Sequence, residues 1–133
     1  LAEKGNGAFL NNQRIRVSKQ KKINNALLVT GGPKGASKIK NKIYSEYINV
    51  SNNVANVRKF GSAALDMAYV GCGRFDGYFQ NNINIWDIAA GIIIVSEAGG
   101  KVSEINHKNF DNINIKASSS NIYEKMLKKL DKF

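Results

Sequence analysis

The longest apolar run of the chain, Ile88 to Val95, is the feature that most limits its fold. It follows a single carboxylate, Asp87, and two residues that commonly end helices, Gly99 and Gly100, close the segment. The run is far shorter than the roughly 20 residues that a membrane-spanning helix needs. The segment therefore predicts a helix that begins at Asp87 and is buried in a protein core.

Composition agrees with one globular domain. The chain has 133 residues, is 43% hydrophobic and contains one proline, so it can bury a core. Its start lacks the pattern of a secretory signal, and we expect a cytoplasmic protein with no membrane-spanning segment. Cys72 has no partner cysteine, which excludes a disulfide framework and a cysteine-rich zinc site and favours a buried thiol.

The net charge of +10 is unevenly distributed. Lys and Arg outnumber acids ten to two in residues 1–50 and seven to four in residues 101–133, but number three against four in residues 51–100. The lysines are scattered and are not joined to aromatic residues or to a groove-reading helix, as nucleic-acid modules usually require. Direct nucleic-acid binding is therefore not expected, and the lysines indicate solvated faces.

The remaining segments alternate between strand and helix patterns. Residues 7–18 hold two alternating runs joined by Asn11 and Asn12, which tolerate the positive φ of a tight turn, so we expect a β-hairpin. No element is expected before this hairpin, as if the chain began inside a domain. Further strands are expected at residues 26–30, 54–60, 74–80, 101–105 and 113–119.

Apolar residues at helical spacing predict three more helices. The first runs from Ser37 to about Ile48; the second has Ser62 as its N-cap and ends at Gly71 or Gly73; the third spans Ser120 to about Leu130. The second is apolar nearly all round, so we expect neighbours to cover it on several sides. The side chains expected to point inward are Ile39, Ile43, Tyr47 and Ile48 in the first helix, and Ile122, Met126, Leu127 and Leu130 in the last. Together these elements predict an α/β layered fold with a mixed sheet flanked by helices.

Two interpretations of Asp87 are open from the residues alone. An Asp at a helix N-terminus accepts hydrogen bonds from unpaired N–H groups and is favoured by the helix dipole, worth about 1 kcal/mol. Alternatively, a rigid helix could aim this carboxylate into a cleft, where it would help to hold Mg²⁺ together with a substrate phosphate.

Longer motifs resemble a known family. The stretch "GSAALDMAYVGCGRFDGYFQ" followed by "WDIAAGIIIVSEAGG", and the opening "KGNGAFLNNQRIRVS", are similar to the second half of the inositol monophosphatase family. The stretch "VRKFGSAALDMAYV" resembles its bacterial, extragenic-suppressor type. The resemblance covers residues 1–133 and implies the C-terminal α/β portion of a layered αβαβα fold, in a family of usually dimeric, Mg²⁺-dependent, lithium-sensitive phosphatases that hydrolyse inositol phosphates and related small phosphomonoesters.

The resemblance also implies roles for individual residues. Asp87 matches the metal-binding aspartate of the family. Gly61, Ser62 and Ala63 match the helix start that lines the inositol pocket, although a plain helix entry explains Ser62 equally well. Gln80 stands where the family usually has a Glu that accepts a hydrogen bond from a sugar hydroxyl. An amide oxygen can still accept this bond but without the strength of a charge, which puts inositol preference in question.

The family's other metal ligands lie in a Glu-Glu element and an Asp-Pro-x-Asp-Gly-Thr run, and neither motif occurs in this sequence. The implied mechanism uses two or three Mg²⁺ ions to activate a water and to stabilise the leaving group. One carboxylate cannot build such a site. We therefore expect a fragment that lacks the N-terminal portion, contains no catalytic residue of its own and is inactive in isolation.

The other acidic residues and the histidine do not change this expectation. Asp66 lies inside a helix, where a satisfied structural role is favoured, and Asp76 precedes Gly77 as a turn residue. Glu97 follows Asp87 by ten residues, roughly 15 Å along a helix, too far to share a metal. His107 lies in a polar loop and is expected to be solvated.

Three functions remain in view. The first is the C-terminal half of the phosphatase, acting on a small phosphomonoester as a homodimer or with the missing half; Arg58 and Lys59 could then face a phosphate or a dimer interface. The second is a transcription-associated module that binds RNA polymerase or its antitermination complex, which a basic surface would suit. The third is a remnant kept for its fold, marked by association through an exposed edge.

Overall fold

The computed structural model describes residues 1–31, 37–105 and 113–130, and within helix α1 it describes side chains only from Tyr44 onward. The strands are β1 (Ala2–Glu3), β2 (Gly7–Leu10), β3 (Gln13–Arg14), β4 (Leu27–Thr30), β5 (Asn56–Arg58), β6 (Gly77–Ile83), β7 (Gly100–Val102) and β8 (Ile113–Ser119). The helices are η1 (Ile23–Asn25), α1 (Ser37–Ser51), α2 (Ala63–Gly71), α3 (Ile85–Glu97) and α4 (Tyr123–Leu130). The predicted alternation of strands and helices is confirmed.

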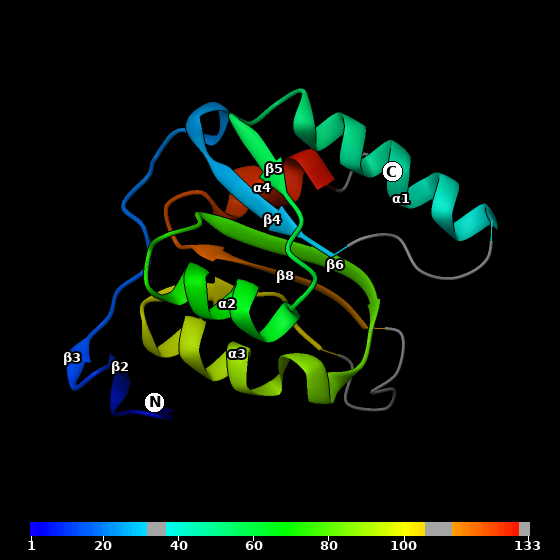
Figure 1. Ribbon diagram of the computed structural model, residues 1–133. Coiled ribbons are helices and arrows are strands. Elements are labelled where there is room, and N and C mark those ends of the chain that lie inside the picture. Colours follow the sequence, from blue (N-terminus) through cyan, green and yellow to red (C-terminus); the bar gives the residue numbers. More distant parts are fainter. Residues whose placement is uncertain (32–36, 106–112, 131–133) are drawn as a thin grey trace.

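The main sheet has five strands in the order β5-β4-β6-β8-β7 (Figure 1). Strand β4 pairs in parallel with β5 and β6, whereas β8 pairs antiparallel with β6 and β7. The sheet is therefore mixed, as predicted. The neighbours β4 and β6 lead into α1 and α3, which cover opposite faces, so the carboxyl ends of these two strands form a topological switch point of the kind where α/β proteins bind ligands.

Each face of the sheet buries its own apolar cluster. Side chains from α1 and α4 pack on one face with Leu28 and Phe79, and side chains from α2 and α3 pack on the other with Val29 and Tyr78. Adjacent residues of β4 and of β6 thus serve opposite faces, as the two-residue period of a strand requires. The result is an α/β/α layer arrangement (Figure 1).

The predicted N-terminal hairpin is present as β2 and β3. Asn11 and Asn12 have φ of 50° and 66°, which matches the two-residue turn expected there. The expectation that nothing precedes the hairpin is wrong, because β1 pairs antiparallel with β2 and extends it to three strands. Glu97 at the end of α3 accepts hydrogen bonds from the backbone N–H groups of Gly5 and Gly7, and this ties the small sheet to α3.

Several boundaries and burial predictions need correction. Helix α3 begins at Ile85 with Asn84 as its N-cap, so Asp87 lies in the first turn and does not open the helix. In α1, Ile48 is exposed and Val50 occupies the core, because the position of α4 decides which face is buried. Ile39 and Ile43 are outside the described side chains. Cys72 is half-buried rather than buried, and its Sγ donates to the Tyr69 carbonyl at 3.5 Å.

Helices α2 and α3 approach closely through two glycines. A Cβ on Gly91 would lie 2.7 Å from Met67 Cβ, and one on Gly71 would lie 2.6 Å from Ile94 Cγ2. Helix α2 also contacts β4, β6 and β8, so α3 and the sheet cover it on more than one side, as expected, although Leu65 is exposed. On α3, Trp86 and Ile93 are exposed. Among the described residues, none of the helices has the length and apolarity to cross a membrane.

Candidate functional site

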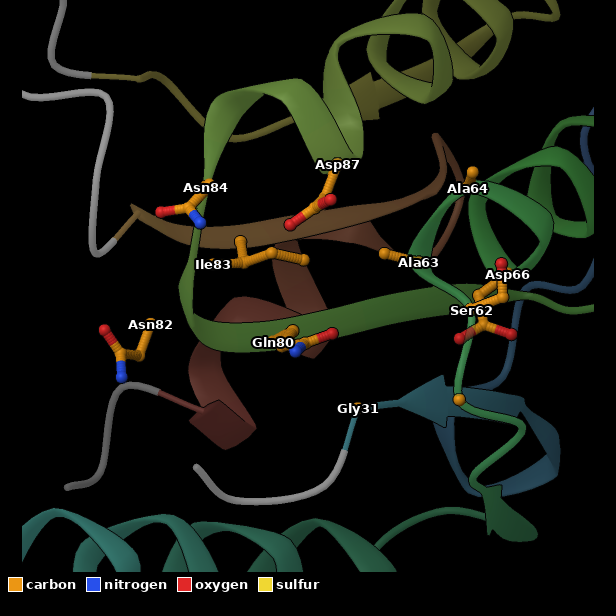
Figure 2. A pocket seen from close by; sticks show the side chains of 11 residues that line it. Gly31, Ser62, Ala63, Ala64, Asp66, Gln80, Asn82, Ile83, Asn84 and Asp87 are labelled. Carbon is orange, nitrogen blue, oxygen red and sulfur yellow. The ribbon is translucent and has the colours of Figure 1, made fainter. Parts of the chain in front are cut away.

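A cavity of about 390 Å³ lies at the carboxyl ends of β4 and β6, at the switch point of the sheet (Figure 2). The starts of α2 and α3 form two of its walls, and the end of β6 crosses between them. It is lined by Gly31, Gly61, Ser62, Ala63, Ala64, Asp66, Gln80, Asn82, Ile83, Asn84 and Asp87. The structure thus brings together all five predicted site residues, Asp87, Gly61, Ser62, Ala63 and Gln80.

The start of α2 is fixed by local chemistry. Ser62 has extended backbone, and its Oγ accepts a hydrogen bond from Leu65 N at 3.3 Å, which confirms it as the N-cap. Gly61 precedes it with φ of 85°, a left-handed conformation that glycine adopts without penalty. The first N–H groups of a helix lack partners within the helix, so this end of α2 presents donors and a positive dipole end to the cavity.

Asp87 enters the same cavity from the first turn of α3. Its carboxylate is exposed and points from α3 toward strand β6 in Figure 2. The N-cap residue Asn84 makes no capping hydrogen bond through its side chain. Two helix N-termini therefore meet at one cavity, an arrangement that favours negatively charged oxygen atoms, whether from Asp87 or from a bound anion.

Asp66 is the largest departure from prediction at this site. It lies one turn after Ser62 on α2, is 1% exposed, and neither carboxylate oxygen receives a hydrogen bond from any described residue. Burial raises its pKa from the ordinary 3.8 to about 6. The expected satisfied structural role is therefore wrong. The spacing from Ser62 did signal that both side chains share one face of α2, but burial without a partner is decided by the tertiary structure.

Gln80 lies on β6 beneath the cavity and is held by two contacts. The buried Tyr78 hydroxyl donates a hydrogen bond to Gln80 Oε1. The side chain also packs against Gly31, where a Cβ would lie 2.1 Å from that oxygen. Beyond Gln80, the register of β6 shifts and Asn82 has φ of 60°, so the strand bends at the rim of the cavity.

The other candidate side chains lie away from the cavity. Glu97 binds the N-terminal sheet, and Asp76 Oδ2 accepts from Leu27 N at 2.7 Å, which adds a structural bond to its predicted turn position. Lys59 Nζ lies 4.6 Å from the centre of the Tyr47 ring on α1, and Arg58 is exposed on β5. His107 is outside the described residues.

The described residues fit part of a magnesium site. Asp87 supplies an exposed carboxylate oxygen, the kind of ligand that Mg²⁺ prefers. Yet no group of three His, Cys, Asp or Glu side chains that could hold a metal ion occurs within the described part of the chain. Asp87 is thus one carboxylate ligand for a Mg²⁺ ion and does not belong to a described cluster of three such side chains.

The layered fold and the polar cavity between two helix starts define an α/β protein of the kind that binds small ligands at the edge of its sheet. The chain belongs to the inositol monophosphatase family: the sequence profile described as "Inositol monophosphatase family" matches residues 1–132. The resemblance stated from the motifs is thereby confirmed.

Individual relatives agree with this assignment. The inositol-1-monophosphatase of Caulobacter vibrioides is 39% identical over 132 residues, which are 96% of this chain and 52% of the relative. The Nus factor SuhB of Pasteurella multocida is 37% identical over 97% of this chain and 49% of its own length. A crystal structure of the extragenic suppressor protein SuhB from Bartonella henselae superposes with a TM-score of 0.86 at 41% identity, covering 98% of this chain and 52% of that one. The chain thus spans about half the length of these relatives.

Proposed function

We propose that the chain is the C-terminal half of a Mg²⁺-dependent phosphatase that hydrolyses inositol 1-phosphate or a related small phosphomonoester. The observation that carries this proposal is the convergence of two helix N-termini and the Asp87 carboxylate on one polar cavity at the switch point of the sheet. We further propose that it works in the cytoplasm, either as a homodimer or joined to an N-terminal half.

Within this proposal each residue has a distinct task. Gly61, Ser62 and Ala63 line the pocket for the alcohol portion of the substrate, because backbone groups and small side chains at the start of α2 allow a close approach. Gln80 faces the alcohol portion of the substrate from β6. Asp87 is one ligand of Mg²⁺, which when bound neutralises phosphate charge and activates a water molecule.

Reconstitution tests the proposal. The 133-residue chain is mixed with the N-terminal half of a bacterial relative that carries the Glu-Glu and Asp-Pro-x-Asp-Gly-Thr elements, and phosphate release from inositol 1-phosphate is followed with and without Mg²⁺. We expect release only from the mixture with Mg²⁺, and loss of that release with Asp87→Asn. Mg²⁺-dependent hydrolysis by the 133 residues alone would contradict the need for a second set of ligands.

A role in transcription is a second candidate. Relatives named Nus factor SuhB favour it, as does the net charge of +10, which suits an acidic partner. In this case the chain binds RNA polymerase or its antitermination complex. Retention of purified polymerase on immobilised chain at low salt, and its release at high salt, would support this function, and no retention at low salt would remove it.

A further inference from the structure

Lysines from separate runs of the sequence come together on one surface of the folded chain. We infer that this surface docks an acidic segment of a protein partner, whose glutamate or aspartate side chains face the lysines. The surface, named here the α4 lysine face, consists of Lys19, Lys21, Lys22, Lys125 and Lys128. The inference rests on the proposed role in transcription for the identity of the partner, which would be the polymerase or its antitermination complex.

Two long-range hydrogen bonds build the α4 lysine face. Lys125 Nζ on α4 donates to the Lys21 carbonyl at 2.8 Å, and Asn121 Nδ2 donates to the Lys19 carbonyl at 3.3 Å. These bonds hold the segment before η1 along the start of α4, although 104 and 102 residues separate the bonded partners in sequence. Lys128 follows Lys125 by three residues and is its neighbour on the helix surface. The fold therefore gathers lysines that the sequence scatters.

Acidic side chains do not balance the charge of this face within the described chain. All five lysines are exposed, and none of them forms an ion pair with an acid among the described residues. Residues 16–25 contain no acid, and Glu124 in the first turn is the one acid of α4. Protein surfaces usually intersperse charges of both signs, so a face of one sign is typical of a surface that meets the opposite charge on a partner.

The side chains on the face distinguish between kinds of anionic partner. The exposed large hydrophobic residues of the described chain lie outside residues 16–25 and outside α4. Helices that bind a lipid surface also insert apolar side chains, and single-stranded nucleic acid is bound by aromatic residues on which bases stack. The face lacks both features. The eight residues of α4 span about 12 Å, a length that about four residues of extended chain cover. A short acidic protein segment therefore suits this face.

Binding of a labelled oligoglutamate peptide to the full 133-residue chain tests the inference by fluorescence anisotropy at low salt. We expect Lys19→Glu/Lys22→Glu to weaken binding by about tenfold, because two attractive charges become repulsive. The matched control is Lys4→Glu/Arg14→Glu, which changes the net charge equally at exposed positions of the small N-terminal sheet, away from α4 (Figure 1). The control should keep the wild-type affinity within about twofold, because salt screens distant charges. Circular dichroism checks that both variants are folded.

Three results with these variants would overturn the inference. The first is equal weakening by both double variants, since net charge and not the α4 lysine face would then decide binding. The second is no binding of the peptide to the wild-type chain at low salt. The third comes from a labelled RNA duplex as a competing probe: tighter binding of the duplex than of the peptide, lost in the same lysine variant, would assign the face to nucleic acid.

Retention of purified RNA polymerase separates this inference from the role on which its partner rests. Retention that is lost in the lysine variant but kept in the control would support both. Retention that both variants keep would leave the role in transcription in place and overturn the α4 lysine face as its docking surface. If the wild-type chain retains no polymerase although peptide binding depends on the face, the role in transcription fails and the face serves another acidic protein.

Discussion

Among the described residues, each face of the main sheet buries one carboxylate, and the two carboxylates differ in whether they have a hydrogen-bond partner. On the α1 side, Glu46 is 6% exposed and accepts a hydrogen bond from Asn81 Nδ2 at 3.1 Å. On the α2 side, Asp66 is 1% exposed and receives no hydrogen bond from any described residue. Buried polar groups normally have a hydrogen-bond partner. The paired Glu46 therefore stabilises the fold, whereas burial of the unpaired Asp66 carboxylate lowers the stability of the folded chain.

This difference extends to the helices on each side. On one face, α1 and α4 are joined over the apolar core by a hydrogen bond from Asn49 Nδ2 to the Lys129 carbonyl at 2.7 Å. On the other, α2 and α3 pack through Gly71 and Gly91, and both begin at the cavity. One face therefore mainly stabilises the molecule, and the other also carries the candidate site. Substitutions on the two faces should separate stability from ligand binding.

The largest effect is expected on the α1/α4 face. Leu28 is fully buried there, and Leu28→Ala leaves a cavity that should lower the free energy of unfolding by about 3 kcal/mol. Urea unfolding followed by circular dichroism measures this loss, and inorganic phosphate affinity of the folded variant should stay at the wild-type value. A loss below about 1 kcal/mol would mean that this face contributes less to stability than its burial indicates.

The next prediction concerns the two buried carboxylates, Asp66 and Glu46, whose replacement should change stability in opposite directions at pH 8. The pKa of Asp66 is about 6 in the folded chain, above its ordinary 3.8, so stability falls as pH rises from about 4 to 6 and the carboxylate loses its proton. The shift corresponds to at most about 3 kcal/mol above pH 6. Asp66→Asn should therefore raise stability at pH 8 and have little effect at pH 4, with Asp87 and Tyr78 left in place.

Glu46→Gln is the matched control for this prediction. It weakens the hydrogen bond from Asn81 and should lower stability by roughly 1 kcal/mol at pH 8. Thermal unfolding of both variants at the two pH values provides the comparison. If Asp66→Asn is instead less stable than wild type at pH 8, the carboxylate has a stabilising partner in solution and the contrast between the two faces is wrong.

Much of the fold could be predicted because its signals are local. The alternation of strands and helices, the turn at Asn11 and Asn12 and the cap at Ser62 depend on residues next to one another in sequence, and all are observed. The start of α3 could not be fixed in the same way. Both Asn84 and Asp87 suit a helix start, and the end of β6 decides that Asn84 is the cap.

Burial and pairing were less predictable because they depend on distant segments. Ile48 fits the apolar stripe of α1, yet the packing of α4 against α1 leaves it exposed. Asp66 gave no sign in sequence that its carboxylate would be buried without a donor. The motif resemblance placed five residues of the cavity, but the orientation of Gln80 depends on Tyr78 and Gly31, which only the folded sheet brings to it.

The smallest effect is expected at the start of α2, which both stabilises the fold and lines the cavity. Ser62 caps α2 through a hydrogen bond of 3.3 Å from Leu65 N, so Ser62→Ala should destabilise the chain by about 1 kcal/mol and Ser62→Gly by only a few tenths. Both variants keep the backbone N–H groups at the helix start. If phosphate is bound by those groups, its affinity should survive in both variants although their stabilities differ. Loss of phosphate affinity in both would instead assign the binding to the Ser62 hydroxyl, and the cap and the ligand would then compete for the same side chain.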